Sequence, residues 1–353
     1  MKKITLITFL SLLGLLAACQ GYKDLSVEEF RDRLSKGGES VQLLDVRTPQ
    51  EFAEGHIPGA INIDWLADGF IEAVQASIAP EQEILIYCRR GRRSAKAADT
   101  LNALGYKRIF NLKEGFNAWK NANLPVTAFE TERFRAPGGA TVDITLIKHA
   151  SLAISYKGLS IQVDPVISLG DNTTDYATFF PEADYVLVTH EHGDHFDKDA
   201  LGLLGGKIVT NANCFRLLES DKMKSQAQVL ANGKSLTLQE GISVEAVPAY
   251  NTTPGREQFH PQGRDNGYIL SLDGFRIYIA GDTEDIPEMA DIKDIDVAFL
   301  PCNQPYTMTP EQCINAARMV NPKVLFPYHF GQTDVSGIPE ALPGIDVRIR
   351  NMQ

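Results

Sequence analysis

The chain has 353 residues, of which 44% are hydrophobic and 22% are charged, with a formal net charge of −11 at pH 7. This composition is typical of a folded globular protein and excludes a disordered or collagen-like chain, while the length allows two ordinary domains. Residues 137–353 carry 16 Lys and Arg against 28 Asp and Glu, which argues against nucleic-acid binding through phosphate neutralisation.

The N-terminus has the pattern of a secretion signal. Two lysines precede an apolar run over residues 4–16, which is too short to span a bilayer comfortably. Leu16-Ala17-Ala18-Cys19 closes this run and resembles the lipobox of bacterial lipoproteins. The resemblance implies a signal peptide over 1–18, lipidation of Cys19 and a lipidated linker over 19–24. We therefore expect a lipid anchor in the cell envelope, at the periplasmic face of the outer membrane; the alternative is ordinary cleavage that leaves Cys19 free.

A first domain is predicted over residues 25–130. Ser26 and Glu29 are spaced as a capping box that opens a helix. Short apolar runs over 41–46 and 84–87 have the length of buried strands, and the spacing over 94–104 is helical. Strands that alternate with helices indicate a parallel α/β sheet.

The chemistry of this domain is expected at Cys88. This cysteine ends a predicted strand, and the loop that follows it contains four arginines. The loop residues are Arg89, Arg90, Gly91, Arg92 and Arg93. Positive charge and a helix N-terminus lower the pKa of a thiol and favour anions, so we predict a nucleophilic thiol beside an anion-binding loop. A buried structural cysteine is the alternative.

Four segments resemble the signatures of the rhodanese family in order. They are residues 45–52, 55–62, 87–94 and 114–119. The resemblance implies that Cys88 carries a persulfide and that the loop over 89–93 cradles a sulfane-sulfur donor such as thiosulfate. Asp45 and Arg47 would then be a structural pair.

A linker is predicted over 131–140, where Arg-Ala-Pro-Gly-Gly interrupts any periodic pattern. A second domain follows over 141–353. Its apolar runs have the length of strands and lie at 143–147, 152–156, 160–164, 185–189, 242–247, 276–280, 297–300 and 324–327. Many strands with few long helices favour a layered α/β sandwich.

The largest group of potential metal ligands lies at residues 189–195, which follow the apolar run over 185–188. The side chains there are His190, His192, Asp194 and His195, and three of the seven histidines of the chain fall in this segment. Imidazole and carboxylate groups are ligands of Zn²⁺, Mn²⁺ and Fe²⁺. Asp164, Asp282 and His329 end other predicted strands, and strand ends converge in space. We therefore predict a metal site.

These motifs together resemble the metallo-β-lactamase fold. Residues 189–195, 281–283 and 327–329 match its metal motifs in order. Residues 149–151 and 163–165 resemble the subgroup of ascorbate-6-phosphate lactonase and the N-acyl-phosphatidylethanolamine phospholipase. The resemblance implies an αββα sandwich that binds two divalent metals, with zinc expected and manganese or iron as alternatives. His190 and His192 would bind the first metal, Asp194, His195 and His329 the second, and Asp282 would bridge them.

One ligand departs from the family pattern. The family supplies a third histidine for the first metal after a strand such as 242–247, where this chain has Asn251. Either the amide oxygen of Asn251 takes that position, or His260 reaches it from the following loop. A surface position for His260 is the third alternative.

The resemblances imply a membrane-anchored hydrolase that uses a metal-bridged hydroxide, oriented by Asp194, on an ester, lactone or phosphodiester. Its expected partners are a small-molecule or lipid-like substrate, a sulfane-sulfur donor for the rhodanese-like domain, and the membrane. One alternative is a persulfide dioxygenase and sulfurtransferase with a single iron. Another is a sulfur-carrier module without catalytic activity.

Overall fold

The computed structural model describes residues 21–37, 41–170, 172–180, 182–350 and 352. The predicted signal peptide and Cys19 lie outside these residues, so the lipobox stays a prediction. Within the described ranges, no helix combines the length and the apolar character that a membrane crossing requires.

The N-terminal domain is built on a parallel five-stranded sheet with the strand order β1-β5-β4-β2-β3. Its strands are β1 (Lys23–Leu25), β2 (Val41–Asp45), β3 (Ala60–Asn62), β4 (Glu83–Tyr87) and β5 (Ile109–Leu112). Its helices are α1 (Val27–Gly37), α2 (Pro49–Ala53), α3 (Phe70–Ser77), α4 (Arg92–Ala103) and α5 (Gly115–Asn121). The predicted capping box opens α1, since the backbone N–H of Glu29 donates to Ser26 Oγ (3.3 Å) and that of Ser26 donates to Glu29 Oε2 (3.0 Å).

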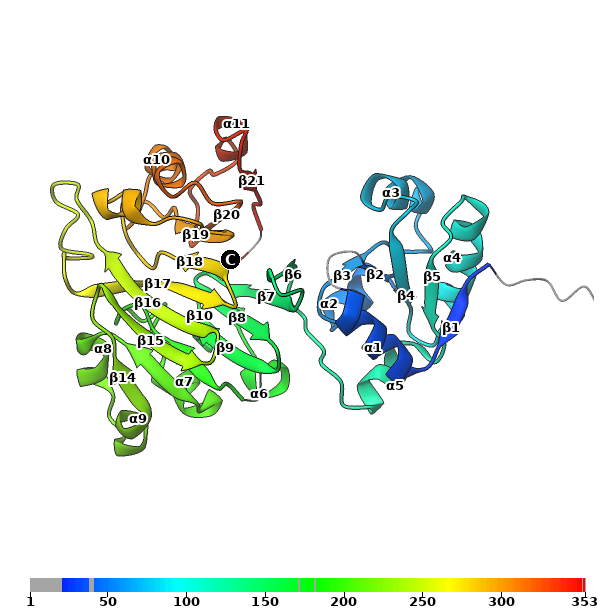
Figure 1. The fold of residues 1–353 in the computed structure, drawn as a ribbon, viewed down its shortest axis with the longest axis horizontal. Coiled ribbons are helices and arrows are strands. Elements are labelled where there is room, and N and C mark those ends of the chain that lie inside the picture. Colours follow the sequence, from blue (N-terminus) through cyan, green and yellow to red (C-terminus); the bar gives the residue numbers. More distant parts are fainter. Residues whose placement is uncertain (1–20, 38–40, 171, 181, 351, 353) are drawn as a thin grey trace, which may run out of the picture.

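Helices cover both faces of this sheet (Figure 1), as the alternation of strands and helices predicts. On one face, α3 and α4 contribute Val74 and Leu101 to the core. On the other face, α1 and α5 contribute Phe30 and Trp119, whose rings pack edge to face at 6.3 Å. The loop that begins at Cys88 leaves this sheet at the C-terminal end of β4.

The C-terminal domain contains two seven-stranded sheets with the orders β14-β13-β12-β9-β8-β7-β6 and β15-β16-β17-β18-β19-β20-β21. The first comprises β6 (Thr131–Arg135), β7 (Thr141–Lys148), β8 (Ser151–Tyr156), β9 (Leu159–Val163), β12 (Tyr185–Leu187), β13 (Lys207–Thr210) and β14 (Ala227–Val229). The second comprises β15 (Lys234–Gln239), β16 (Ile242–Ala249), β17 (Asp265–Leu272), β18 (Phe275–Ile279), β19 (Val297–Pro301), β20 (Val324–Tyr328) and β21 (Asp346–Val347). A small hairpin joins β10 (Ser168–Leu169) to β11 (Asn172–Thr173).

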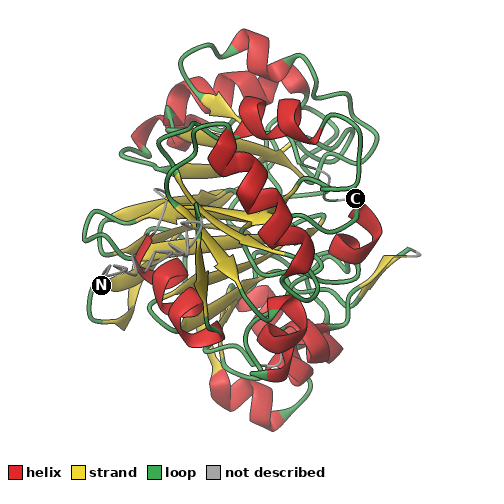
Figure 2. Ribbon diagram, turned by 90° about the vertical axis from the view of Figure 1, so that its right-hand side faces the viewer, coloured by secondary structure: helices red, strands yellow, loops and turns green. Residues whose placement is uncertain are grey.

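The helical segments of this domain lie outside the sheets (Figure 2). They are α6 (Tyr176–Phe179), α7 (Lys198–Leu204), α8 (Ala212–Leu217), α9 (Asp221–Gln226), η2 (Pro287–Asp291), α10 (Pro310–Val320) and α11 (Ile338–Ala341). The inner faces of the sheets form one core, in which the rings of Phe299 and Phe326 stack at 5.0 Å. Separate apolar clusters join α7 to the first sheet and α10 to the second. This layering confirms the predicted αββα sandwich.

The predicted linker over 131–140 is wrong in part. Residues 131–135 form β6, which pairs antiparallel with β7 from Thr131–Thr145 to Arg135–Thr141. The Pro-Gly-Gly sequence that suggested a linker is instead the turn of this hairpin, closed by hydrogen bonds between Ala136 and Ala140 (2.9 Å) and between Gly139 and Ala136 (2.7 Å).

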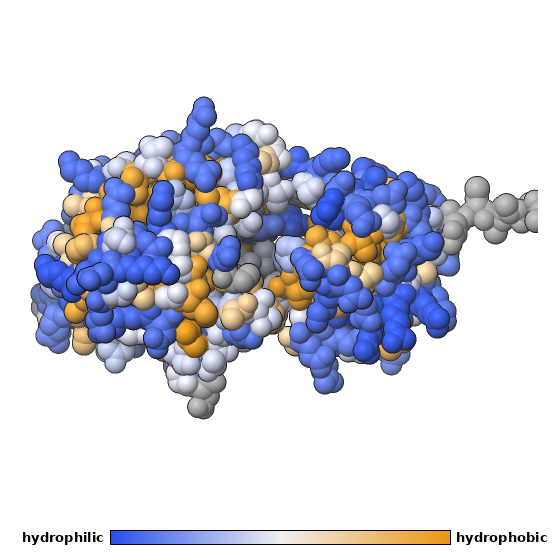
Figure 3. Space-filling view, turned by 90° about the horizontal axis from the view of Figure 1, so that it is seen from below, coloured by the Kyte–Doolittle hydropathy of each residue, from blue (hydrophilic) through white to orange (hydrophobic). Residues whose placement is uncertain are grey.

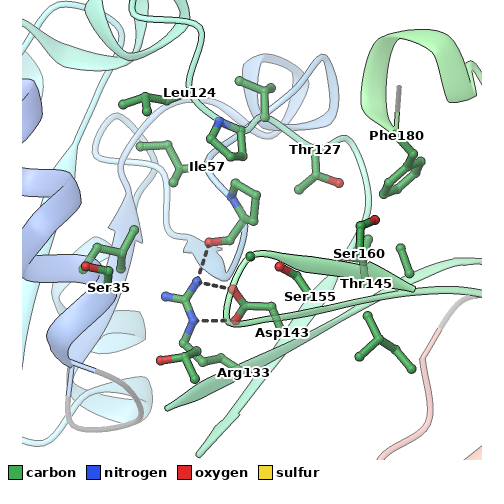
Figure 4. Close-up of a pocket in the computed structure, with 18 of the residues that line it drawn as sticks. Ser35, Ile57, Leu124, Thr127, Arg133, Asp143, Thr145, Ser155, Ser160 and Phe180 are labelled. Atoms are coloured by element: carbon green, nitrogen blue, oxygen red, sulfur yellow. Dashed lines mark hydrogen bonds and ion pairs between the residues drawn. The ribbon is translucent and has the colours of Figure 1, made fainter. Parts of the chain in front are cut away.

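The two domains enclose a cavity of about 680 Å³ on the outer side of β7 and β8. Apolar side chains gather on the surface of the N-terminal domain near this junction (Figure 3). Arg133 at its edge pairs with Asp143 (Nε–Oδ1 2.7 Å) and donates to the Pro58 carbonyl at 3.3 Å (Figure 4). A backbone bridge between His56 and Thr127 fastens the end of the N-terminal domain to its body near this junction.

Candidate metal centre

Three histidines form the first ligand cluster. His190 and His192 lie in the turn that follows β12, and His260 lies in the loop between β16 and β17. One ring nitrogen of each lies within 4.8 Å of the others. His190 Nε2 and His192 Nδ1 are 3.1 Å apart. Two ligands at about 2.0–2.1 Å from a tetrahedral Zn²⁺ would lie about 3.3 Å apart, so this spacing fits a metal.

A second cluster combines Asp194, His195, His329 and His149. His329 follows β20, and His149 lies in the turn between β7 and β8. The carboxylate of Asp194 lies 3.0 Å from His149 Nε2, 3.3 Å from His329 Nε2 and 3.9 Å from His195 Nε2, all measured to Oδ2. The rings of His149 and His329 pack with their centroids 3.7 Å apart.

Asp282, which follows β18, lies between the two clusters. Its Oδ2 is 3.4 Å from His260 Nε2 and 4.0 Å from His190 Nε2 on one side, and 3.5 Å from His329 Nε2 on the other. Its Oδ1 is 3.3 Å from His195 Nε2. The structure thus places Asp282 where a carboxylate could bridge two metals.

Two atoms of this centre test whether it fits a cation. His195 Nε2 and Asp282 Oδ1 are buried, and neither makes a hydrogen bond to any described residue. Buried polar atoms without partners are costly, and a metal between them would satisfy both. Burial, followed by the charge of His195, also holds the pKa of His190 well below its usual value, which keeps this imidazole in the neutral form that binds metals. The donor set therefore fits divalent metal ions.

Backbone strain is concentrated at the same place. His149, Asp164 and His329 have φ values of 52°, 41° and 49°, and they are three of the eight described non-glycine residues with positive φ. Such conformations cost free energy and cluster at functional sites. Each of these residues lies at the end of a strand, and the turn aims its side chain at the centre.

Two buried carboxylates each contact the Nδ1 atom of a ligand histidine. Asp164 Oδ2 lies 2.8 Å from His195 Nδ1 and accepts a hydrogen bond from Thr189 Oγ1 at 2.6 Å. Asp265 Oδ2 lies 3.1 Å from His260 Nδ1. A carboxylate on Nδ1 fixes the tautomer that leaves Nε2 free for a metal.

The structure brings His260 into the first cluster. The amide oxygen of Asn251, the other proposed ligand atom, is buried and makes no hydrogen bond to any described residue. The amide nitrogen of Asn251 donates to the carbonyls of Tyr306 (2.7 Å) and Arg256 (3.2 Å), so this side chain fastens the loop. The other predicted ligands all lie within the two clusters or at Asp282. The ligand set predicted from the sequence does not include His149. The features that could have indicated a ligand role are the subgroup motif over 149–151 and the position of His149 directly after a strand.

The loop after Cys88 has the predicted strand-to-helix geometry. Cys88 is 2% exposed, and Ser94 Oγ lies 3.4 Å from its sulfur. Gly91 precedes α4 with φ of 78°, and a Cβ there would lie 1.9 Å from the Lys113 carbonyl, so only glycine fits.

The arginines of this loop divide into two groups. Arg93 is engaged by Glu51 through two hydrogen bonds of 2.7 and 2.8 Å, which lower the pKa of that carboxyl. Arg89, Arg90 and Arg92 are exposed. The expected pair of Arg47 and Asp45 is buried, with Nη2 and Oδ2 2.6 Å apart.

Comparison with protein families divides the chain as the fold does. Residues 143–329 match the Beta-lactamase superfamily domain, and residues 26–122 match the Rhodanese-like domain.

Curated relatives and solved structures resemble the C-terminal domain. A UPF0173 metal-dependent hydrolase of Thermococcus kodakarensis is 31% identical over 54% of this chain and 84% of its own length. A second one, from Thermus thermophilus, is 30% identical over 54% of this chain and 84% of its own length. A crystal structure from Parabacteroides distasonis, described as a metal-dependent hydrolase, is 52% identical and covers 64% of this chain and 100% of its own, with a TM-score of 0.59. The structure of Igni18, a metallo hydrolase of Ignicoccus hospitalis, is 26% identical and covers 60% of this chain and 95% of its own, with a TM-score of 0.51.

Proposed function

The chain belongs to the beta-lactamase superfamily and is a metal-dependent hydrolase with a rhodanese-like domain, and we propose that it cleaves an ester, lactone or phosphodiester at a dinuclear centre. The observation that carries this proposal is the position of Asp282 between two ligand clusters. His190, His192 and His260 would hold the first metal, and Asp194, His195 and His329 the second. Zinc is the metal that this mixed imidazole and carboxylate set favours, with manganese or iron as alternatives.

Divalent metals supply a nucleophile at neutral pH, because they lower the pKa of water, and they polarise the oxygen of the bond under attack. Asp194 is accessible to solvent, since 30% of its side chain is exposed while Asp282 is 3% exposed. Burial raises the pKa of Asp194, but hydrogen bonds with His149 and His329 outweigh burial and hold the pKa well below its usual value. Asp194 is therefore ionised at neutral pH, and its Oδ1 could accept a hydrogen bond from an incoming water and orient it.

The test of this function is metal removal and restoration. The full chain, stripped with a chelator, should lose hydrolysis of p-nitrophenyl esters and of bis-p-nitrophenyl phosphate, and two equivalents of zinc per chain should restore it. An Asp282→Asn variant should bind metal more weakly at both sites. Hydrolysis that survives complete metal removal would refute the proposal.

We further propose that this domain resembles the subgroup of the ascorbate-6-phosphate lactonase and the N-acyl-phosphatidylethanolamine phospholipase. The motifs at 149–151 and 163–165 support it, because His149 and Asp164 lie directly against metal-ligand side chains. A small or lipid-like ester or phosphoester is then the expected substrate. Turnover of lactones by the full chain would favour a small ester substrate, and turnover of lipid phosphodiesters would favour a lipid-like phosphoester.

For the N-terminal domain we propose sulfur transfer through a persulfide on Cys88. The strand-to-helix loop and the three exposed arginines beside this thiol support binding of an anionic sulfane-sulfur donor such as thiosulfate. The transfer of sulfur from thiosulfate to cyanide by the full chain tests it, and a Cys88→Ser variant should abolish that transfer.

We propose the lipid anchor from the sequence of residues 1–19, in which two lysines and an apolar run precede Leu16-Ala17-Ala18-Cys19. A labelled fatty acid should be incorporated into the chain in bacterial cells and should be lost in a Cys19→Ala variant. The acylated protein should then fractionate with the outer membrane.

A further inference from the structure

The ligand His260 is carried by a long loop rather than by a strand end. This loop leaves β16 after Ala249 and reaches β17 only at Asp265. The other ligands of the first cluster follow β12 within a tight turn, whose geometry fixes their positions. A loop ligand needs contacts of its own to be held in place, because loops are more mobile than the elements they connect.

Arg264 supplies these contacts through every nitrogen of its guanidinium group. Its Nε and Nη2 donate to the two carboxylate oxygens of Asp265 at 2.7 and 2.9 Å, and Asp265 in turn holds His260 Nδ1. Its Nη2 also donates to the Phe259 carbonyl at 2.7 Å. Its Nη1 lies 3.0 Å from Oε1 of Glu191, the residue between the ligands His190 and His192.

We propose that Arg264 is a positioning residue for the first metal, which joins the His190–His192 turn to the loop that carries His260. The inference rests on the proposed dinuclear function. The guanidinium group presents its donors in a rigid planar fork, so it fixes both the distance and the angle between the turn and the carboxylate of Asp265. Asp265 is fully buried, and without the guanidinium its charge would lose its strongest partner and hold His260 less firmly.

A second arginine fastens the same loop independently. Arg256 Nη1 donates to Glu284 at 2.8 Å, and this buried carboxylate also accepts the backbone N–H groups of Thr252 (2.8 Å) and Thr253 (2.6 Å). The general path of the loop is therefore maintained without Arg264. Loss of Arg264 should release the end of the loop that carries His260 and leave the rest of the domain in place.

The matched control is Arg133. Like Arg264, it makes two contacts to one carboxylate and one to a backbone carbonyl. It differs in lying at the domain junction, beside a cavity in which no metal-ligand side chain takes part (Figure 4). An Arg133→Ala variant therefore reports what the loss of such an arginine does to the chain in general.

The experiment titrates zinc into the metal-free full chain in competition with a chromophoric chelator. In Arg264→Ala, the affinity for one of the two zinc ions should fall about 10- to 100-fold, while the affinity for the other stays unchanged. Arg264→Lys, which keeps the charge and loses the fork, should fall between Arg264→Ala and the wild type. Arg133→Ala should bind both ions as the wild type does.

The proposal is overturned if Arg264→Ala binds both ions with wild-type affinity, or if both affinities fall alike. Should Arg264→Ala fail to fold, Arg264→Lys decides by the same criteria. A wild-type chain that binds a single ion would instead refute the dinuclear function, so the two failures are distinguishable.

Discussion

Asp164 is the buried group on which the second metal should depend most strongly after its own ligands. It is fully buried and accepts hydrogen bonds from Thr189 N (2.8 Å) and Thr189 Oγ1 (2.6 Å), and its Oδ2 lies 2.8 Å from His195 Nδ1. If His195 binds metal through Nε2, its Nδ1 carries the proton and donates to Asp164.

An Asp164→Asn variant should weaken the second metal without disturbing the fold. Asparagine tolerates the positive φ of 41° at this position, and its oxygen can still accept from Thr189 N. Its NH₂ group would then face the Nδ1–H of His195, so a donor would meet a donor where a charged acceptor stood. We expect the zinc affinity of the second site to fall about 10- to 100-fold, or about 1.4 to 2.8 kcal/mol.

Zinc titration against a chelator measures this effect, and thermal unfolding of the metal-free chain tests that the fold is intact. Asp184→Asn is the control, because Asp184 also accepts a backbone N–H, from Ser160 at 2.8 Å, but contacts no metal ligand. If Asp164→Asn binds both zinc ions as tightly as the wild type, Asp164 does not orient His195 and the reasoning fails.

Three further predictions follow from the same structure. His260→Ala should bind one zinc ion per chain, whereas Asn251→Ala should still bind two, as counted by elemental analysis. The reverse result would show that Asn251, and not His260, is the third ligand of the first metal. Cys88→Ser should lose sulfur transfer and keep full ester hydrolysis, and a parallel loss of both activities would show that the domains are chemically coupled. Phe326→Ala, in the core between the sheets, should destabilise the chain by about 3–5 kcal/mol in urea denaturation, and a cost below about 1 kcal/mol would contradict the packing of Phe326 against Phe299.

The ligands that could be predicted from the sequence share one property. His190, His192, Asp194 and His195 lie in one short segment after an apolar strand, so local geometry alone brings them together. His329 is predictable because it directly follows another strand. That strand, β20, lies in the second sheet and β12 lies in the first, so the ligands meet where the two sheets of the sandwich face each other.

His260 could not be assigned from the sequence for a physical reason. It lies five residues before the start of β17 and nine after Asn251, in a loop that Arg256 and Arg264 fasten at separate points through buried carboxylates. The contacts of Arg256 with Glu284 and of Arg264 with Glu191 join residues far apart in the chain, so no local pattern predicts them.

The error at β6 has a related origin. Proline and two glycines in sequence are typical of a domain linker, but the same residues also form tight hairpin turns. The distinction depends on whether the flanking segments pair, and β6 is an edge strand whose only described partner is β7. Its alternating side chains, with Phe134 buried and Arg135 exposed, were the available signal.

The metal content of the purified full chain, measured together with its reaction, tests the central claim most directly. We predict two divalent ions per chain, with zinc favoured, and hydrolysis of an ester, lactone or phosphodiester that disappears and returns with the metal. One iron per chain, with oxygen consumption on a persulfide substrate and no metal-dependent hydrolysis, would contradict this account and establish a persulfide dioxygenase instead.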